Sequence, residues 1–106
     1  MASTPEAKVK KAVREILIEF RCFVRQPVTG GFGSSGQLDF YNSVPPFGRY
    51  LGVECKSIYS SYGKRGVTAL QQREIDEIRA TGGTALVIDE TNFDLLRSTL
   101  RELAQA

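Results

Sequence analysis

The hydrophobic positions near the start of the chain recur at helical spacing. Thr4 is suited to an N-cap, Pro5 to the first helical position and Glu6 to the first turn of a helix. The apolar residues that follow share one helical face: Val9, Val13, Ile16, Leu17 and Phe20. This pattern predicts an amphipathic first helix that ends before Cys22.

Three apolar segments of strand length come next, at about residues 22–28, 37–42 and 49–57. The glycine-rich segment 29–36 separates the first two, and a turn over residues 45–48 separates the second from the third. Three strands in succession favour antiparallel pairing.

The second half of the chain predicts a helix, a strand and a helix. Thr68 and Gln71 have the spacing of a capping box, and Gly82-Gly83 ends the helix after about Thr81. A short apolar strand over residues 84–89 precedes a last helix from about Asn92. A β–α–β segment favours a parallel neighbour. The predicted order αβββαβα is an α/β fold with a mixed sheet flanked by helices, in a single domain of residues 1–106.

Composition narrows the chemistry. The chain has no histidine, and its two cysteines, Cys22 and Cys55, form no CxxC pair. These facts exclude histidine-based triads and zinc sites built from Cys and His. The sequence has neither a signal peptide pattern nor an apolar run of transmembrane length. We therefore expect no membrane association and a cytoplasmic location.

The charge is unevenly distributed along the chain. Residues 1–73 hold 11 basic and 5 acidic side chains, whereas residues 74–106 hold 3 and 7. A basic face would attract the phosphates of a nucleic acid. An uneven but merely solvated surface explains the same numbers equally well.

The candidate chemistry centres on Glu54 and Lys56. In a strand these two side chains point to one face, while those of Val53 and Cys55 point to the other. Asp39 supplies a second carboxylate from a neighbouring strand. Two carboxylates bind Mg²⁺, and a lysine beside them stabilises developing negative charge, so the set suits metal-dependent phosphodiester hydrolysis. The alternatives are a solvated Asp39 on an edge strand and a simple Glu54–Lys56 salt bridge.

These residues resemble a known family. The series Gly36-Gln37-Leu38-Asp39, Glu54-Cys55-Lys56, Gln71 and Gly82-Gly83 is similar to that of VRR-NUC domains, a branch of the PD-(D/E)xK nuclease superfamily. The resemblance covers nearly the whole chain and implies a restriction-endonuclease-like core. One departure is Leu38, where the family usually has proline before the aspartate.

The resemblance implies a metal site and a catalytic lysine. Asp39 and Glu54 match the acids that bind Mg²⁺ (or Mn²⁺), with the backbone carbonyl of Cys55 as a further ligand, and Lys56 matches the catalytic lysine. Glu6 matches the acidic residue that often opens the first helix. A favourable interaction with the helix dipole also explains Glu6.

Gln71 matches the family's downstream glutamine. Its spacing from Gly82 favours it over the adjacent Gln72. A role as cap partner for Thr68 also explains this glutamine.

Basic residues near the predicted site are candidates for contacting the DNA backbone, which positions a duplex without reading its sequence. These residues are Arg21, Arg25, Lys64, Arg65 and Arg73. A solvated loop is the alternative for those in the segment 58–67. The glycine-rich segment lacks a Walker lysine and precedes a strand, so we expect no nucleotide cofactor.

Short, stand-alone members of the family resemble the junction resolvases of phages and bacteria. The resemblance therefore implies a Mg²⁺-dependent endonuclease acting on branched DNA, such as four-way (Holliday) junctions, in recombination and repair within a bacterial or phage-infected cell. Two symmetric cuts need two active sites, so we expect a homodimer. A plausible dimer surface consists of Phe40, Tyr41, Val44, Pro45, Pro46 and Phe47. The competing interpretations are a catalytically silent DNA-binding module and a structural subunit.

Overall fold

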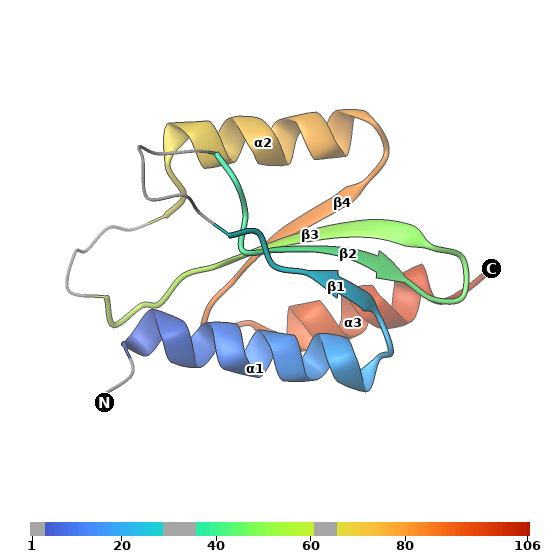
Figure 1. Cartoon of the computed structure of the whole chain (residues 1–106), viewed down its shortest axis with the longest axis horizontal. Helices are drawn as coiled ribbons and strands as arrows, with labels where there is room; N and C mark the ends of the chain where they lie inside the picture. The colour runs from blue at the N-terminus through green and yellow to red at the C-terminus, as the bar shows by residue number, and fades with distance from the viewer. Residues whose placement is uncertain (1–3, 29–35, 61–65) are drawn as a thin grey trace.

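The structure is a computed structural model that describes residues 4–28, 36–60 and 66–106 (Figure 1). The elements in these ranges are α1 (Pro5–Glu19), β1 (Phe23–Arg25), β2 (Phe40–Val44), β3 (Arg49–Cys55), α2 (Ala69–Ala80), β4 (Thr84–Ile88) and α3 (Phe93–Leu103). This is the predicted order αβββαβα.

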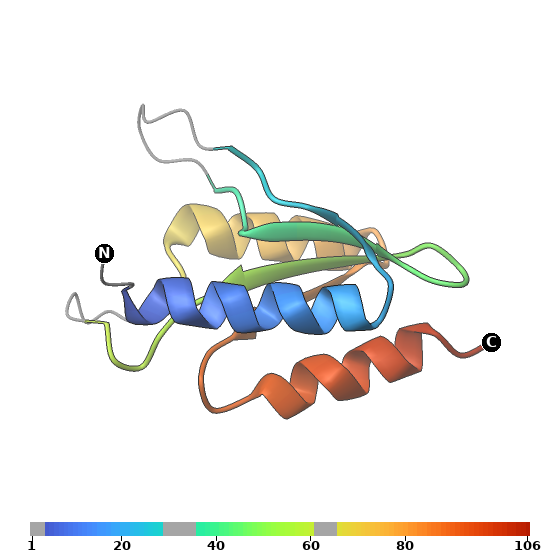
Figure 2. The same cartoon turned by 60° about the horizontal axis from the view of Figure 1, so that its bottom comes forward.

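The described strands form one mixed sheet in the order β1-β2-β3-β4. The pairs β1–β2 and β2–β3 are antiparallel, whereas β3 and β4 are parallel. Helix α2 covers one face of the sheet, and α1 and α3 lie on the other (Figures 1 and 2). The predicted mixed sheet flanked by helices is therefore confirmed.

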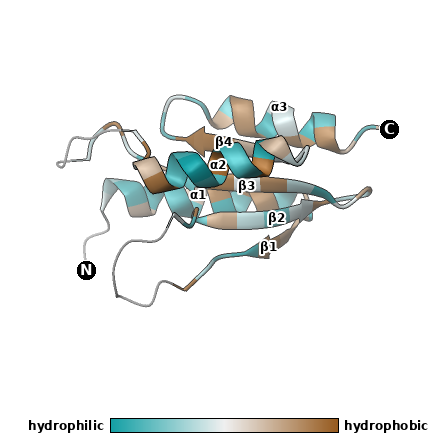
Figure 3. Ribbon diagram, turned by 90° about the horizontal axis from the view of Figure 1, so that it is seen from above, coloured by the Kyte–Doolittle hydropathy of each residue, from teal (hydrophilic) through white to brown (hydrophobic). Residues whose placement is uncertain are grey.

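Each face of the sheet has its own hydrophobic core. The larger core lies against α1 and α3 and consists of Val9, Val13, Ile16, Leu17, Phe40, Val44, Leu51, Val53, Cys55, Ile88, Leu96 and Leu100. The smaller one lies under α2 and consists of Leu38, Ile75 and Ala85. The outer face of α2 is largely hydrophilic and β4 behind it is hydrophobic (Figure 3), as burial of apolar surface between layers requires.

Helix α1 begins as its sequence predicts. The Thr4 hydroxyl accepts a hydrogen bond from the Ala7 amide at 3.0 Å, and Pro5 occupies the first turn. The predicted apolar face is buried, with Phe20 partly buried at the C-cap. Full burial of each large aliphatic side chain stabilises the fold by about 1.5–3 kcal/mol. This packing holds α1 against the sheet.

Helix α2 begins with both halves of the predicted capping box. The Thr68 hydroxyl accepts from the Gln71 amide, and the Gln71 side-chain oxygen accepts from the Thr68 amide, each at 3.1 Å. Gly36 lies against this first turn, because a Cβ atom there would come within 2.6 Å of the Leu70 carbonyl oxygen. Only glycine therefore allows the segment that leads to Asp39 to pass so close to α2.

The predicted strand boundaries need three corrections. Strand β1 covers 23–25 rather than 22–28, because Pro27 has no amide hydrogen for the ladder. Strand β2 covers 40–44 rather than 37–42, so Asp39 precedes the strand; the Leu38 amide donates to the Tyr41 hydroxyl instead of to a neighbouring strand. Strand β3 ends at Cys55 rather than at residue 57.

Part of the predicted dimer surface is wrong. Phe40 and Val44 are each only 1% exposed and belong to the larger core, so neither side chain is available to a second subunit. Phe47, in the turn after β2, is 51% exposed. In the described parts of the chain, no helix has both the length and the apolar character needed to cross a bilayer.

Candidate active site

The two predicted acidic residues lie opposite each other at one end of the β2–β3 ladder. The ladder ends at the pair Phe40 and Val53, so the next opposed pair is Asp39 and Glu54. Directly opposed residues of antiparallel strands share a face of the sheet. The β2–β3 register therefore brings close together two acidic residues that are 15 positions apart in sequence, with Asp39 directly before the first residue of β2.

Beyond the last backbone pair of the ladder, each of these two carboxylates accepts a hydrogen bond from a backbone amide of the facing segment. The Asp39 amide donates to Glu54 Oε1 at 3.1 Å, and the Cys55 amide donates to Asp39 Oδ2 at 2.8 Å. Bonds from a backbone amide to an ionised carboxylate are among the stronger hydrogen bonds in proteins. Both carboxylates are thus held in fixed orientations.

Lys56 and Gln71 converge on one oxygen atom of Glu54. Lys56 Nζ lies 3.2 Å from Glu54 Oε2, and Gln71 Nε2 donates to the same oxygen at 2.9 Å. The Gln71 oxygen meanwhile completes the capping box, so one side chain both caps α2 and contacts Glu54. Gln72 instead donates to Asp76 on the exposed face of α2. Of the two glutamines, only Gln71 reaches Glu54.

Burial makes Glu54 a weaker acid than an exposed glutamate. The residue is only 2% exposed. Burial, followed by the neighbouring charge of Asp39, raises the pKa of Glu54 from 4.5 to about 7, although Lys56 lowers it. The pKa of the Cys55 thiol is also raised, chiefly by burial and then by Asp39 and Glu54. Cys55 therefore keeps a neutral thiol, and the hard ligand that it offers is its backbone carbonyl.

The donor set suits a hard divalent cation. Carboxylate and carbonyl oxygens are the ligands that Mg²⁺ prefers, and Mg²⁺ usually keeps several waters beside one or two carboxylates. Within a strand, the amide and carbonyl of one residue point to the same side, so the Cys55 carbonyl points toward Asp39, as its amide does. Among the described residues no cluster of three or more Asp, Glu, Cys or His side chains is arranged to hold a metal ion. The groups that could hold such a cation are the carboxylates of Asp39 and Glu54 and the Cys55 carbonyl, with water completing the coordination.

Glu6 lies on the first turn of α1 and faces this end of the sheet. It is partly buried, and its charge contributes to the raised pKa of Glu54. Glu6 thus adds negative charge near Glu54. Its role as a metal ligand stays a prediction.

Lys10 is a residue of the site that sequence reasoning missed. Its Nζ lies 3.3 Å from Asp39 Oδ1. Lys10 follows Glu6 by four residues and so shares its helical face, which was an available signal. That signal does not reveal that this face meets Asp39, because the contact depends on how α1 packs on the sheet.

The described residues that were predicted to contact DNA, Arg21, Arg25 and Arg73, lie on separate parts of the fold rather than in one cluster. Arg21 follows α1 at the end opposite Glu6, and the 15 residues of this helix span about 22 Å. Arg25 stacks on the Phe23 ring at the edge of the sheet, and Arg73 pairs with Glu77 on α2. Lys64 and Arg65 lie outside the described residues.

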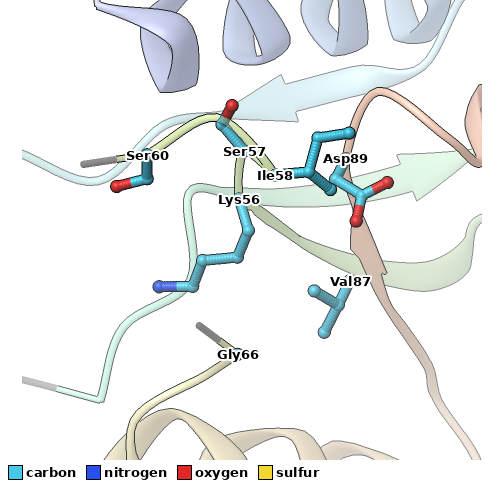
Figure 4. Close-up of a pocket in the computed structure, with 7 residues that line it drawn as sticks. All are labelled: Lys56, Ser57, Ile58, Ser60, Gly66, Val87 and Asp89. Atoms are coloured by element: carbon cyan, nitrogen blue, oxygen red, sulfur yellow. The ribbon is translucent and has the colours of Figure 1, made fainter. Parts of the chain in front are cut away.

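A pocket of about 360 Å³ lies beside the acidic pair, at the ends of β3 and β4 (Figure 4). It is lined by Lys56, Ser57, Ile58, Ser60, Gly66, Val87 and Asp89. The Lys56 side chain extends away from Asp89, as Figure 4 shows. Asp89 Oδ1 accepts from the Thr91 amide and hydroxyl, so this third carboxylate stabilises the turn before α3.

Comparisons with known proteins bear on the fold. No protein-family model matches the chain, and no curated protein matches it. A solved structure described as a "VRR_NUC domain" superimposes with a TM-score of 0.67 at 24% identity, covering 93% of this chain and 97% of that chain. This chain therefore has the fold of a VRR_NUC domain, as its sequence motifs indicated.

Proposed function

We propose that this protein is a divalent-metal-dependent nuclease that hydrolyses phosphodiester bonds of DNA. The observation that carries the proposal is the convergence of Lys56 and Gln71 on one oxygen of Glu54, next to the opposed carboxylate of Asp39. This arrangement occurs on a fold shared with a VRR_NUC domain. A plain salt bridge between Glu54 and Lys56 would need neither the second carboxylate nor the glutamine.

Each side chain has a distinct part in the proposed reaction. Asp39, Glu54 and the Cys55 carbonyl would hold Mg²⁺ or Mn²⁺, which supplies Lewis-acid charge at the scissile phosphate when bound. The Lys56 ammonium would orient the attacking water and stabilise the negative charge that develops on the phosphate oxygens. Gln71 is a positioning residue, because its amide holds Glu54 Oε2 in place.

The proposed substrate is branched DNA, in particular four-way junctions, and the proposed active form is a homodimer in the bacterial or phage-infected cytoplasm. The basis is the sequence resemblance to short junction resolvases, together with the need for two sites to make two symmetric cuts. The residues proposed to contact backbone phosphates of the DNA are Arg21, Arg25, Lys64, Arg65 and Arg73.

The outer edge of β4 is poorly suited to the dimer contact. Its outward carbonyls at Ala85 and Val87 accept hydrogen bonds from the side chains of Arg79 and Asn92, at 2.8 and 3.0 Å. Side chains that occupy edge carbonyls hinder the addition of another strand. The exposed turn that contains Phe47 remains from the predicted dimer surface and is the better candidate.

The test is cleavage of a labelled four-way junction beside a linear duplex of the same arm sequence, with Mg²⁺, Mn²⁺ or EDTA. Wild type is expected to cut the junction only with metal, and Lys56→Ala is expected to lose cleavage. Lys11→Ala is the matched control, because Lys11 is an exposed lysine whose partner is Glu15 on the same helix.

Three outcomes separate the interpretations. Metal-dependent junction cleavage that requires Lys56 supports the whole proposal. Cutting of the duplex alone keeps the nuclease and removes the junction preference. Binding of DNA without cleavage in either metal would identify a catalytically silent DNA-binding module instead.

A further inference from the structure

The two oxygens of the Asp39 carboxylate are held in different ways. Oδ2 accepts from the Cys55 amide, a rigid backbone donor. Oδ1 lies 3.3 Å from the ammonium of Lys10, at the end of a flexible side chain. On Glu54, Oε1 accepts from the Asp39 amide and Oε2 accepts from Gln71 and pairs with Lys56. Among the oxygens of this pair, Oδ1 is therefore the one that a side-chain movement in α1 alone would free.

Lys10 is well placed to make such a movement. Its side chain is 34% exposed, compared with 17% for that of Asp39. Lysine has a flexible four-carbon stem and a strongly hydrated ammonium, so leaving a partly exposed carboxylate has a small free-energy cost. Lys56, in contrast, is 23% exposed and pairs with the almost fully buried Glu54.

The charges at this end of the sheet indicate what such a movement would do. Glu6, Asp39 and Glu54 face Lys10 and Lys56, which leaves an excess of negative charge when all five are ionised. A bound divalent cation reverses the sign of that balance. An anionic phosphate is then attracted to the site, and an ammonium released from Asp39 has a new partner within reach.

Building on the proposed function, we propose that Lys10 is an exchangeable counter-ion of the metal site. It neutralises Asp39 Oδ1 when no cation is bound, and it binds a backbone phosphate of DNA when a divalent cation occupies Asp39. The cation and Lys10 then compete for Asp39 Oδ1. Binding of the cation, in contrast, strengthens binding of the DNA phosphate, because it releases Lys10.

The first test measures cation affinity without any cleavage. Mn²⁺ binding is followed by electron paramagnetic resonance in wild type, Lys10→Met and the control Lys11→Met. Lys11 is the next residue of α1, and its side chain is 81% exposed and 3.9 Å from Glu15, away from the site. Methionine is a good helix former, so both variants should fold. Lys10→Gln is measured in parallel as a second variant that removes the same charge.

Lys10→Met and Lys10→Gln are expected to bind Mn²⁺ about fivefold more tightly than Lys11→Met, because they lose both the competing ion pair and the repulsion of a nearby positive charge. Unchanged or weaker binding would overturn the inference and make Lys10 a purely structural support of Asp39. Asp39→Asn separates this failure from that of the proposed function. If wild type and Asp39→Asn bind Mn²⁺ equally, the metal site itself is wrong.

The second test measures the affinity for a labelled junction by fluorescence anisotropy, in EDTA and in Ca²⁺, with a gel to verify that the DNA stays intact. In EDTA, Lys10→Met and Lys11→Met should bind alike, because Lys10 is engaged by Asp39. In Ca²⁺, the affinity of Lys10→Met for the junction should be lower than that of Lys11→Met by a factor of about three or more. This is the loss expected when one phosphate contact is removed. An equal loss under both conditions would refute the proposed exchange.

Discussion

The buried carboxylate of Glu54 should make the metal-free protein less stable as pH rises. Burial and Asp39 raise the pKa of Glu54 from 4.5 to about 7. Between these two values, folded Glu54 keeps a proton that the unfolded chain has released. The unfolded state then binds fewer protons than the folded state, so the free energy of unfolding falls as pH rises through this window and levels off above it.

The expected loss is about 3 kcal/mol, at about 1.4 kcal/mol for each pH unit between the two pKa values. This is a large part of the stability of a small domain. Because the chain has no histidine, no imidazole titration overlaps this pH range. Glu54→Gln removes the titrating group, so its free energy of unfolding should be nearly independent of pH over the same window.

The assay is urea unfolding followed by circular dichroism in EDTA, near pH 5 and near pH 8. Wild type should lose about 2–3 kcal/mol between the two conditions, and Glu54→Gln should lose little. Glu77→Gln is the matched control, because Glu77 is exposed on α2 and pairs with Arg73 at 3.7 Å. It should keep the pH dependence of wild type. Equal pH dependence in wild type and Glu54→Gln would refute the reasoning, because Glu54 would then titrate alike in the folded and unfolded chains.

Three further predictions concern the supports of the site. Gly36→Ala should lower the free energy of unfolding by about 1–3 kcal/mol in urea unfolding, because its Cβ would come within 2.6 Å of the Leu70 carbonyl oxygen; unchanged stability would contradict this close approach. Tyr41→Phe should cost about 1–3 kcal/mol in the same assay, because it leaves the Leu38 amide without its partner at 3.0 Å, and a neutral effect would mean that water replaces the hydroxyl. Near pH 8, Mg²⁺ at one hundred times its dissociation constant should stabilise wild type by about 2.7 kcal/mol in thermal or urea unfolding, and Asp39→Asn should abolish this gain. An equal gain in both proteins would place the cation elsewhere.

Local sequence patterns were sufficient for the elements that depend on neighbouring residues. The Thr4 cap, the capping box of Thr68 and Gln71 and the apolar faces of the helices act within one or two helical turns. They could be predicted because hydrogen bonds and side-chain periodicity at short range do not depend on the rest of the fold. The order αβββαβα follows from the same information.

The strand ends were harder to predict, because a ladder ends where its partner ends. Residues 37–39 were predicted to begin the second strand, yet β2 begins only at Phe40. The Leu38 amide and the Asp39 side chain bond to Tyr41 and Cys55 in place of a continued ladder. The same contacts explain why a leucine is accepted where the resembling family has proline, since its amide has a partner.

The sequence alone predicted the candidate residues Asp39, Glu54, Lys56 and Gln71, from strand alternation and from the spacing of the motifs that resemble a VRR-NUC domain. Only the tertiary structure decided their geometry. The β2–β3 register places Asp39 opposite Glu54, the packing of α2 brings Gln71 rather than Gln72 to Glu54, and the packing of α1 adds Lys10. The physical reason is that side-chain periodicity is set by the local backbone. Contacts between residues 15 or more positions apart depend instead on how separate elements bury their apolar faces against one another.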